Sequence, residues 1–464
     1  MNSKWYLRTL ALLLVLLMLA ACSGGAGDGQ EPAEDTETTA EEPAAEEEQA
    51  ADEEDEPAEA EEESDEVIEL TYWHTNPGPA GDAQDELVEM FNESQDRIHV
   101  STEFQGSYDD LATSILTAFA GGGGPDVSQL GTFEILEFYN SGVLVDLKPY
   151  LDGPNGVDTS AWPGTLLSAG EFDGGVYWLP FNVAVPVLYY NQEAFDEAGL
   201  DGPPETWEEF YDYARQLTVT DDSGNVERYG VAYIPGWFSW AMTSTIWSEG
   251  GEITNKDYTD ITLNDPVVVD VLGEFQALIE EEAAVLPDDA SGGHRGMFMN
   301  GQAAMILDSP APFGDIFENA VGFTPAVANY PAGEVGREYN PGGGGIAMIA
   351  SGDEAKRDAA WEFMKFMISP ESLAYYAERS GYVAWTPEAQ EAAGDLLEDE
   401  RYATIHEAVP YLRGDFSANF SPAVRTNFDQ AWQSIFVEGA DPQEALDAAD
   451  ARAEEEIDEE IFAP

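Results

Sequence analysis

The chain has 464 residues, with 93 Asp and Glu against 17 Lys and Arg, and carries a formal net charge of −76 at pH 7. This balance excludes nucleic acid as a partner, because binding DNA or RNA requires basic residues that neutralise phosphates. It also predicts a protein of a saline habitat, because salt at about 1 M shortens the Debye length to about 3 Å and screens the repulsion between carboxylates.

The first 21 residues have the pattern of a secretion signal. Lys4 and Arg8 precede the apolar run LALLLVLLMLAA, which ends directly before Cys22, the one cysteine of the chain. About a dozen apolar residues are too few to cross a hydrocarbon core of about 30 Å, which needs about 20. The stretch LAAC resembles a bacterial lipobox, which implies cleavage after residue 21, lipidation of Cys22 and an extracytoplasmic protein anchored to the cell membrane. An ordinary cleaved signal with an incidental cysteine is the alternative.

Residues 22–66 are predicted to be a disordered acidic tether that begins at the lipidated cysteine. Residues 23–66 hold 21 Asp and Glu and no Lys, Arg or aromatic residue, so they have too little apolar surface to bury a core. Subtracting them, and the two basic residues of the signal, leaves 72 acidic and 15 basic residues in 67–464, a net charge of −57. Those residues form the predicted folded body.

Strand-like and helix-like segments alternate from residue 67 onward. Ile68, Leu70 and Tyr72 alternate as in a strand, and residues 83–94 then have helical spacing with Leu87, Met90 and Phe91 on one face. A second strand at 97–106 and a second helix at 108–122 follow, which favours a parallel sheet with helices on its faces. Further along we expect an extended apolar run at 175–191 and amphipathic helices at 206–218, 266–282, 355–369 and 441–461. The predicted fold class is α/β with more than one lobe.

No catalytic or metal-binding pattern stands out in the sequence. The four histidines are scattered without metal-ligand spacing, and GxSxG and CxxC are absent; the histidines are His74, His99, His294 and His406. The glycine runs at 121–124 and 342–345 lack the GK[ST] of a phosphate loop. They favour helix ends or places where backbone approaches a ligand. We therefore predict no enzyme activity, no metal and no cofactor.

Six segments in order carry a resemblance to a known family. They are IELTYWH, GGGGPDVSQL, LYYNQEAFDEAGLDGPPETWEEFYDYARQLT, MFMNGQAAMI, PGGGGIAMIASG and AAWEFMKFMISPESLAYYAERSGYVAWTPEA. In this order they resemble the solute-binding proteins (family 1) of bacterial ABC importers for sugars. YWH, FNVAVPVLYYN, GWFSW and AVRTNFDQAWQSIF are most similar to the binding proteins for glycerol 3-phosphate and its diesters.

The resemblance implies a two-lobed clamp of the periplasmic-binding-protein type (type II). By analogy the first lobe takes residues 67–185 and 307–350, and the second takes 186–306 and 351–464. A ligand in the cleft between the lobes favours the closed form, which the membrane permease recognises. The protein would act as a monomer and perform no chemistry on its ligand.

The same resemblance implies a set of ligand-binding residues. Tyr108 matches a ligand-contacting tyrosine, Trp237 and Trp240 match a pair of rings, and Arg425 matches an arginine that meets a phosphate. Ser309 aligns with a cleft serine, and Gly343 and Gly344 fall where backbone N–H groups face the ligand. Core packing for the tryptophans, a surface position for Tyr108 and a structural ion pair for Arg425 are the alternatives.

Two departures bear on which ligand is expected. Thr132 stands where the glycerol-phosphate proteins carry a glutamate for the glycerol hydroxyls, with Glu134 two residues on, and Val183 and Ala184 replace a serine pair. Because buried polar groups must be matched, we expect a mono- or oligosaccharide, with glycerol 3-phosphate or its diesters as the alternative. A sugar sensor or adhesin, and a secreted glycoside hydrolase with two flanking carboxylates, are alternatives from other classes.

Overall fold

The computed structural model describes residues 67–132, 134–233, 238–254, 260–287, 293–350, 354–413 and 422–461. The expected signal, Cys22 and the acidic tether lie outside these ranges, as does Trp237. Within them, the helices are too short or too polar to cross a membrane.

Among the described residues, five strands form a first, mixed sheet in the order β2-β1-β3-β13-β6. β1 pairs in parallel with β2 and β3, while β13 runs antiparallel to β3 and β6. The strands are β1 (Ile68–His74), β2 (Ile98–Phe104), β3 (Val127–Gly131), β6 (Leu179–Ala184) and β13 (Gly342–Met348). The predicted strand–helix–strand–helix start of the body is confirmed.

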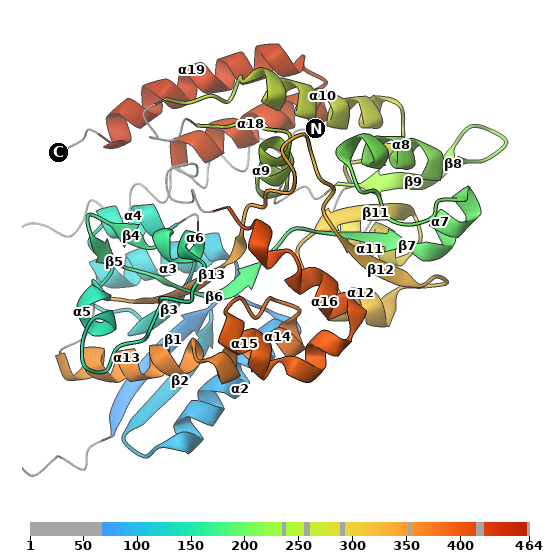
Figure 1. The fold of residues 1–464 in the computed structure, drawn as a ribbon. Coiled ribbons are helices and arrows are strands. Elements are labelled where there is room, and N and C mark those ends of the chain that lie inside the picture. Colours follow the sequence, from blue (N-terminus) through green and yellow to red (C-terminus); the bar gives the residue numbers. More distant parts are fainter. Residues whose placement is uncertain are drawn as a thin grey trace, which may run out of the picture. The chain divides into compact units, whose positions relative to one another are not determined.

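Helices from two distant segments, 78–120 and 354–380, pack on this sheet or against one another (Figure 1). They are α2 (Gly78–Ser94), α3 (Tyr108–Ala120), α13 (Glu354–Met367) and α14 (Pro370–Ser380). α3 begins at a capping box, in which Ser107 and Asp110 each accept a hydrogen bond from the other's backbone N–H. α2 buries Leu87 and Phe91 as its spacing predicts, whereas Met90 is 42% exposed, at the edge of the apolar stripe.

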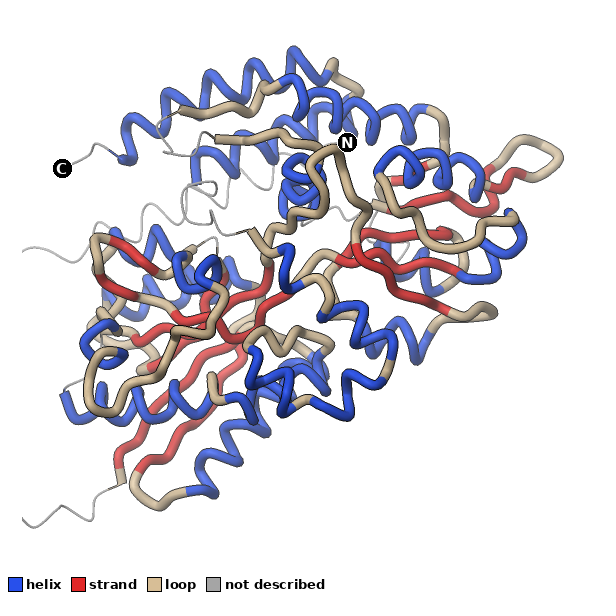
Figure 2. The backbone as a smooth tube through the Cα atoms, viewed as in Figure 1, coloured by secondary structure: helices blue, strands red, loops and turns tan. Residues whose placement is uncertain are grey.

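A second sheet has the order β10-β9-β11-β7-β12 in the part of the chain that is described, with β8 paired to β9. β7 is antiparallel to β11 and β12, and β9 is parallel to β11 (Figure 2). Its strands are β7 (Val187–Asn191), β8 (Val219–Thr220), β9 (Val226–Ala232), β10 (Ala284–Val285), β11 (Ala303–Asp308) and β12 (Pro325–Asn329). A short hairpin joins β4 (Glu171–Phe172) to β5 (Gly175–Val176).

The remaining helices surround the second sheet or connect the elements. α10, α18 and α19 lie together (Figure 1), α10 also contacts α8 and α9, and α18 also contacts α9. The helices are α4 (Ile135–Asn140), α5 (Lys148–Leu151), α6 (Gly164–Ser168), α7 (Gln192–Ala198), α8 (Trp207–Leu217), α9 (Phe238–Ser248), α10 (Pro266–Glu280), α11 (Gly293–Met299), α12 (Phe313–Asn319), α15 (Pro387–Ala392), η2 (Gly394–Glu398), α16 (Glu400–His406), η3 (Val409–Tyr411), α18 (Pro422–Glu438) and α19 (Pro442–Ile461). The helices expected at 206–218, 266–282, 355–369 and 441–461 are therefore present.

Two segments join a different sheet from the one that the predicted lobes assign to them. β12 lies in segment 307–350, which is expected in the first lobe, yet it pairs with β7 in the second sheet. α13 and α14 lie in segment 351–464, expected in the second lobe, yet α13 packs on β1 through Phe363, whose ring meets Tyr72 and Phe91. Helical and strand periodicity do not reveal which sheet an element joins, since both sheets offer an apolar face.

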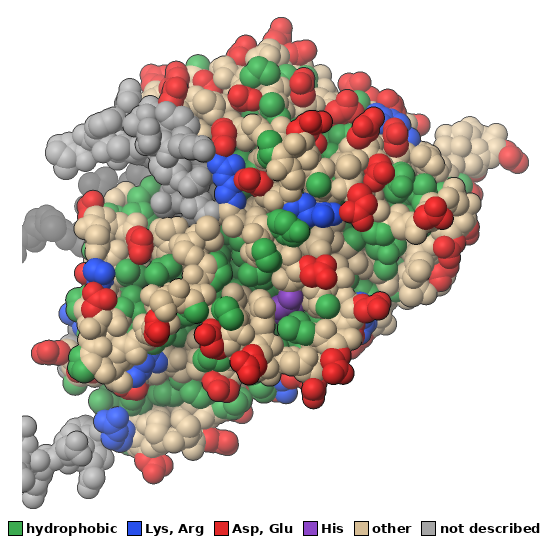
Figure 3. Space-filling view, viewed as in Figure 1, with side chains coloured by type: hydrophobic (Ala, Val, Ile, Leu, Met, Phe, Trp, Pro, Cys, Tyr) green, Lys and Arg blue, Asp and Glu red, His purple; other side chains and the backbone are tan. Residues whose placement is uncertain are grey.

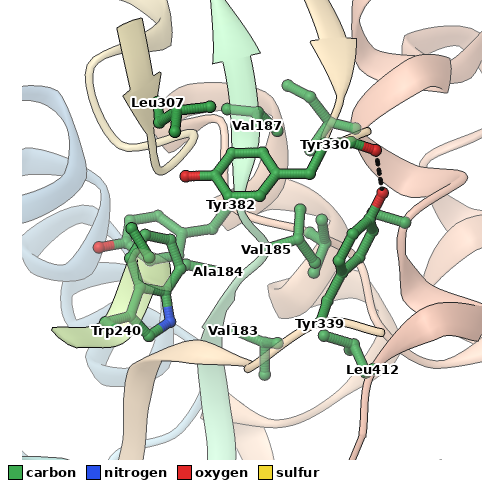
Figure 4. Close-up of a cluster of buried hydrophobic side chains, with 14 of the residues drawn as sticks. Val183, Ala184, Val185, Val187, Trp240, Leu307, Tyr330, Tyr339, Tyr382 and Leu412 are labelled. Carbon is green, nitrogen blue, oxygen red and sulfur yellow. Dashed lines mark hydrogen bonds between the residues drawn. The ribbon is translucent and has the colours of Figure 1, made fainter. Parts of the chain in front are cut away.

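The apolar run at 175–191 is a direct passage between the two sheets. β6 ends at Ala184 in the first sheet and β7 begins at Val187 in the second, and Val185 between them is fully buried. The run is mostly apolar, with Asn182 as a buried exception, because both faces of these strands are covered. Figure 4 shows the cluster around this passage, where the Tyr339 hydroxyl donates to the Tyr330 carbonyl at 3.0 Å.

The glycines of β13 let other groups touch its backbone. A Cβ on Gly345 would lie 2.0 Å from the Leu179 carbonyl oxygen and 2.4 Å from the Trp178 ring. These contacts leave no room for a side chain between β13 and β6.

We expect Gly345→Ala to lower the free energy of unfolding by about 1–3 kcal/mol, because the added methyl group overpacks the strand pair. The matched control is Gly273→Ala in α10, where a Cβ meets no atom within 4 Å. There the gain in helix propensity should raise stability by about 0.5–1 kcal/mol. Urea unfolding at constant salt measures both, and equal effects at the two positions would contradict the packing argument.

Candidate functional site

A cavity of about 460 Å³ opens where several strands end. Most of its lining residues lie at or just after the carboxyl ends of β1, β2, β3, β6 and β11, which is where α/β sheets bind ligands, or at the start of β13. Trp240, Arg295 and Tyr382 join the lining from α9, from α11 and from the segment after α14. A volume in this range suits a small solute. The lining is Thr75, Asn76, Pro77, Phe104, Gly106, Ser107, Tyr108, Gly131, Ala184, Trp240, Arg295, Asp308, Ser309, Ala311, Gly342, Gly343 and Tyr382.

Tyr108 presents a hydrogen-bonding hydroxyl at the cavity wall. Its oxygen accepts from the side-chain amides of Gln129 and Asn182, each at 3.1 Å. Burial raises the pKa of Tyr108 above its ordinary value, so the phenol stays protonated. A hydroxyl whose oxygen already accepts two bonds has its proton left to donate to an acceptor.

Amide side chains fix the neighbouring wall at Asn76. Gln129 donates to the Asn76 oxygen at 2.6 Å and Gln84 donates to the same oxygen at 2.8 Å. The Asn76 amide donates in turn to the Tyr382 hydroxyl at 3.3 Å. The network holds Asn76 in one orientation, which preorganises the polar groups of the wall.

Glu134 lies behind Gly131, directly beside Tyr108. A Cβ on Gly131 would lie 2.3 Å from Glu134 Oε2 and 3.1 Å from the Tyr108 ring, so the glycine is what permits this approach. Glu134 is 8% exposed, and its Oε2 accepts no hydrogen bond among the described residues. Burial raises the pKa of Glu134 to about 7, although Arg425 opposes the rise.

Arg425 reaches the same place from α18. Its Nη1 is 3.7 Å from Glu134 Oε1, and its Nη2 is 3.8 Å from Asp109 Oδ1. Glu134 directly precedes α4, and Asp109 lies in α3. Arg425 instead lies in α18, which packs with α9, α10 and α19. These ion pairs therefore join two groups of helices across the site.

Trp240 forms an aromatic wall against the start of β13. Its indole N–H donates to the Asn340 carbonyl at 3.0 Å, and a Cβ on Gly342 would lie 2.8 Å from the ring. Gly343 has φ +82° and lies so close to Asn182 that a Cβ would be 1.9 Å from that carbonyl oxygen. The ring and the glycine backbone thus pack together as one surface of the cavity.

Arg295, Asp308 and Ser309 occupy the wall at the end of β11. Arg295 donates through Nε and Nη2 to the two Asp308 oxygens at 2.6 and 2.8 Å. His294 Nε2 lies 2.7 Å from Asp308 Oδ2. Burial by itself would raise the pKa of Asp308, but Arg295 and His294 hold it below its ordinary value.

The structure gathers most of the expected site residues but not all of them at the lining. Tyr108, Trp240, Ser309 and Gly343 line the cavity. Glu134 and Arg425 lie just behind it, and a Cβ on Gly344 would lie 2.8 Å from the Tyr108 hydroxyl. Thr132 is buried, and its hydroxyl has no hydrogen-bond partner in the ranges described. Trp237 lies outside the described residues.

Most of the lining residues were not among the site residues expected from the sequence, and they include Asn76, Phe104, Arg295, Asp308 and Tyr382. The segment around Asn76 has the composition of a turn and contains no binding motif. Its position just after the end of β1 could have indicated a ligand site, because α/β sheets bind ligands at the carboxyl ends of their strands. Phe104 is 55% exposed, which is unusual for a phenylalanine at a strand end. For Arg295 and Asp308 no local motif exists. The described residues also contain no group of His, Cys, Asp and Glu that could hold a metal ion.

Comparisons with known proteins agree with one another. The sequence pattern of the family described as bacterial extracellular solute-binding protein matches residues 74–374. The sn-glycerol-3-phosphate-binding periplasmic protein UgpB of Pectobacterium atrosepticum is 27% identical over 423 residues, which cover 82% of this chain and 89% of that protein. UgpB of Rhizobium meliloti is 27% identical over 341 residues, which cover 70% of this chain and 76% of that protein.

Solved structures give the same result. UgpB from Mycobacterium tuberculosis in complex with glycerophosphocholine superposes with a TM-score of 0.77 at 26% identity, covering 86% of this chain and all of that one. An ABC substrate-binding protein from Listeria monocytogenes in complex with cycloalternan has a TM-score of 0.74 at 24% identity and covers 84% of this chain and 99% of that one. At this identity the likeness shows only that the two proteins share a fold. The predicted two-lobed binding-protein fold class is thereby confirmed.

The raised pKa of Glu134 predicts a pH-dependent stability. Between its ordinary value of 4.5 and about 7 the folded state holds more protons on this group than the unfolded state. Stability should therefore fall as pH rises across that window, by about 3 kcal/mol at most. Glu134→Gln removes the titrating group, so the free energy of unfolding of the variant should not fall in this window for this reason. The free energy of unfolding of the wild type minus that of the variant should therefore decrease as pH rises.

Urea unfolding at several pH values between 4.5 and 7.5 measures this difference. Glu171→Gln, at an exposed carboxylate, serves as the control and should give a curve parallel to that of the wild type. A difference between wild type and Glu134→Gln that is constant with pH would show that burial does not perturb Glu134.

Proposed function

Since the chain belongs to the bacterial extracellular solute-binding proteins, a family that is not enzymatic, we propose that it captures glycerol 3-phosphate or one of its diesters and delivers it to an ABC importer. This reverses the order of the two sequence-based expectations, in which a mono- or oligosaccharide came first. The glycoside hydrolase alternative is dropped with the family assignment.

The position of Glu134 beside Arg425 carries this proposal. Thr132 occupies the position aligned with the glutamate of glycerol-phosphate proteins, but Glu134 brings a buried carboxylate to the wall behind Gly131. A carboxylate can accept from glycerol hydroxyls, and a guanidinium 3.7 Å from it suits a phosphate. Full-length relatives that are named for glycerol 3-phosphate support the same ligand class.

A neutral sugar remains the second candidate because of the aromatic surfaces. Trp240 and Phe104 line the cavity, and flat apolar rings suit the C–H faces of sugars and polyols. A neutral sugar has no phosphate charge for the guanidinium to balance, however, so its affinity should depend less on Arg425. The two candidates differ in their dependence on Arg425.

Closure of a two-lobed clamp would be driven by the solute itself. Tyr108 and Glu134 belong to the first sheet and its connections, whereas Trp240 and Arg425 lie on helices that pack together outside it. A solute held by both groups binds the closed form more tightly and shifts the population toward it. The closed form would then be the one the permease subunits recognise, while a sensor or adhesin using the same clamp would need no permease.

The acidic surface is consistent with an extracytoplasmic protein of a saline habitat. Figure 3 shows carboxylates scattered over the visible face with few Lys and Arg among them. We propose that the mature protein begins at a lipidated Cys22, is joined to its folded body by the acidic tether of residues 22–66 and acts as a monomer. The tether would let the body reach the permease without leaving the membrane surface.

Calorimetric titration of residues 23–464 in molar salt tests the ligand class. We expect binding of glycerol 3-phosphate or glycerophosphocholine, and Arg425→Ala should weaken it at least about 10-fold, since a hydrogen bond to a charged group contributes about 1.5–3 kcal/mol. Arg379→Ala, at a surface arginine stacked on Tyr375, should leave the affinity unchanged. Binding of maltose or glucose alone, insensitive to Arg425→Ala, would overturn the proposal in favour of a sugar.

The anchor is tested by Cys22→Ser in the producing cell. Removing the thiol removes the acylation site, so the protein should move from the membrane fraction to the medium or periplasm. Fractionation with detection by antibody measures the shift, and Ser23→Ala is the control that should stay with the membrane. Equal distribution of the wild type and Cys22→Ser would favour the ordinary cleaved signal.

A further inference from the structure

We propose that Arg295 is a further ligand-contacting residue, which donates to an acceptor oxygen of the solute at the end of the cavity formed by Ser309, with Asp308 and His294 as positioning residues. The inference rests on the proposed function, because it names a second recognition point for the same solute. It implies a solute with oxygen acceptors at two separate places.

The hydrogen bonds of Arg295 to Asp308 occupy one edge of its guanidinium. Nε and Nη2 both donate to Asp308, whereas Nη1 donates to no atom in the described parts of the chain. The side chain is 38% exposed, although its partner Asp308 is fully buried, and Arg295 lines the cavity. The exposed N–H groups are therefore available to an acceptor that enters the cavity.

Asp308 is built to hold the guanidinium in one orientation. Its Oδ2 receives Arg295 and His294, and its Oδ1 receives Arg295 and the Ser309 backbone N–H at 2.6 Å. Because an ionised carboxylate only accepts, His294 Nε2 carries a proton in this arrangement. A two-point fork of this kind fixes the plane of the arginine as well as its position.

This arrangement exceeds what folding alone requires. A buried ion pair contributes little net stability compared with well-packed apolar residues, because both charges must be desolvated. Here the Asp308 side chain is fully buried, whereas the Arg295 side chain is partly exposed and lines a cavity. Such an asymmetric pair stabilises a fixed, partly exposed cation, which is a preorganised donor for a ligand oxygen.

Arg295 and Arg425 act on different parts of the solute. Arg295, in α11, lies beside Ser309, the residue that follows β11 of the second sheet. Arg425, in α18, lies beside Glu134, which follows β3 of the first sheet. A solute with a phosphate at one place and a hydroxyl or second anionic oxygen at the other satisfies both. A solute with only an apolar group at the Arg295 end would leave buried N–H groups unpaired and would be rejected.

The test compares variants of residues 23–464 by calorimetric titration with glycerol 3-phosphate and with glycerophosphocholine. The double variant Arg295→Met with Asp308→Asn removes both charges together, so that no unpaired buried charge remains. We expect it to bind the preferred solute at least about 10-fold more weakly than the wild type. Its thermal unfolding without ligand should stay within a few degrees of the wild type. Arg379→Met, at a surface arginine, is the matched control.

Affinity within twofold of the wild type in a folded double variant would overturn the role of Arg295. If that variant does not fold, Arg295→Lys replaces it and the same criterion applies, since lysine keeps the charge beside Asp308 but not the fork. A wild type that binds neither solute would instead refute the proposed function. Retained binding in the Arg295 variants with loss in Arg425→Ala would refute this inference alone.

Discussion

The backbone of residues 342–345 is the constraint on which the rest of the site depends. β13 pairs with both β3 and β6, and its glycines are in contact with Trp240, Asn182, Tyr108 and Trp178 at distances that exclude any Cβ. Four groups from distant parts of the chain thereby use one stretch of bare backbone as their common surface. The aromatic wall, the tyrosine hydroxyl and the strand order are all positioned by it.

Two kinds of buried charge surround the cavity, and they differ in how fully they are paired. Asp308 is saturated by Arg295, His294 and a backbone N–H, so its charge is stable inside the protein. Glu134 has an oxygen without a hydrogen bond and an arginine at 3.7 Å, so burial shifts its pKa instead. The fully hydrogen-bonded Asp308 holds the Arg295 guanidinium in place, whereas Glu134 keeps an oxygen that can accept a hydrogen bond from a ligand.

The extreme charge of the chain has little to do with the site. Carboxylates are scattered over the visible surface, while the cavity is lined by aromatic rings, the Asn76 amide, glycine backbone and Arg295, which pairs with Asp308. Arg425, which pairs with Glu134, lies behind the lining. Long-range repulsion among surface carboxylates is screened by salt, but buried pairs are screened much less. Salt can therefore govern solubility and folding of the body without altering the local chemistry that selects a solute.

The sequence by itself determined the local elements and the fold class, because helical and strand periodicity, caps and glycine stops act over a few residues, as in α8, α10 and α3. It also pointed to Tyr108, Trp240, Ser309 and Gly343 through resemblance. Only the tertiary structure decided that β12 and α13 join the sheets they do, and that the Glu134 carboxylate packs behind Gly131, next to Tyr108. The bond from Asn76 to Tyr382 spans 306 positions. Such contacts depend on how sheets and helices pack over long distances in sequence, and no local pattern encodes them.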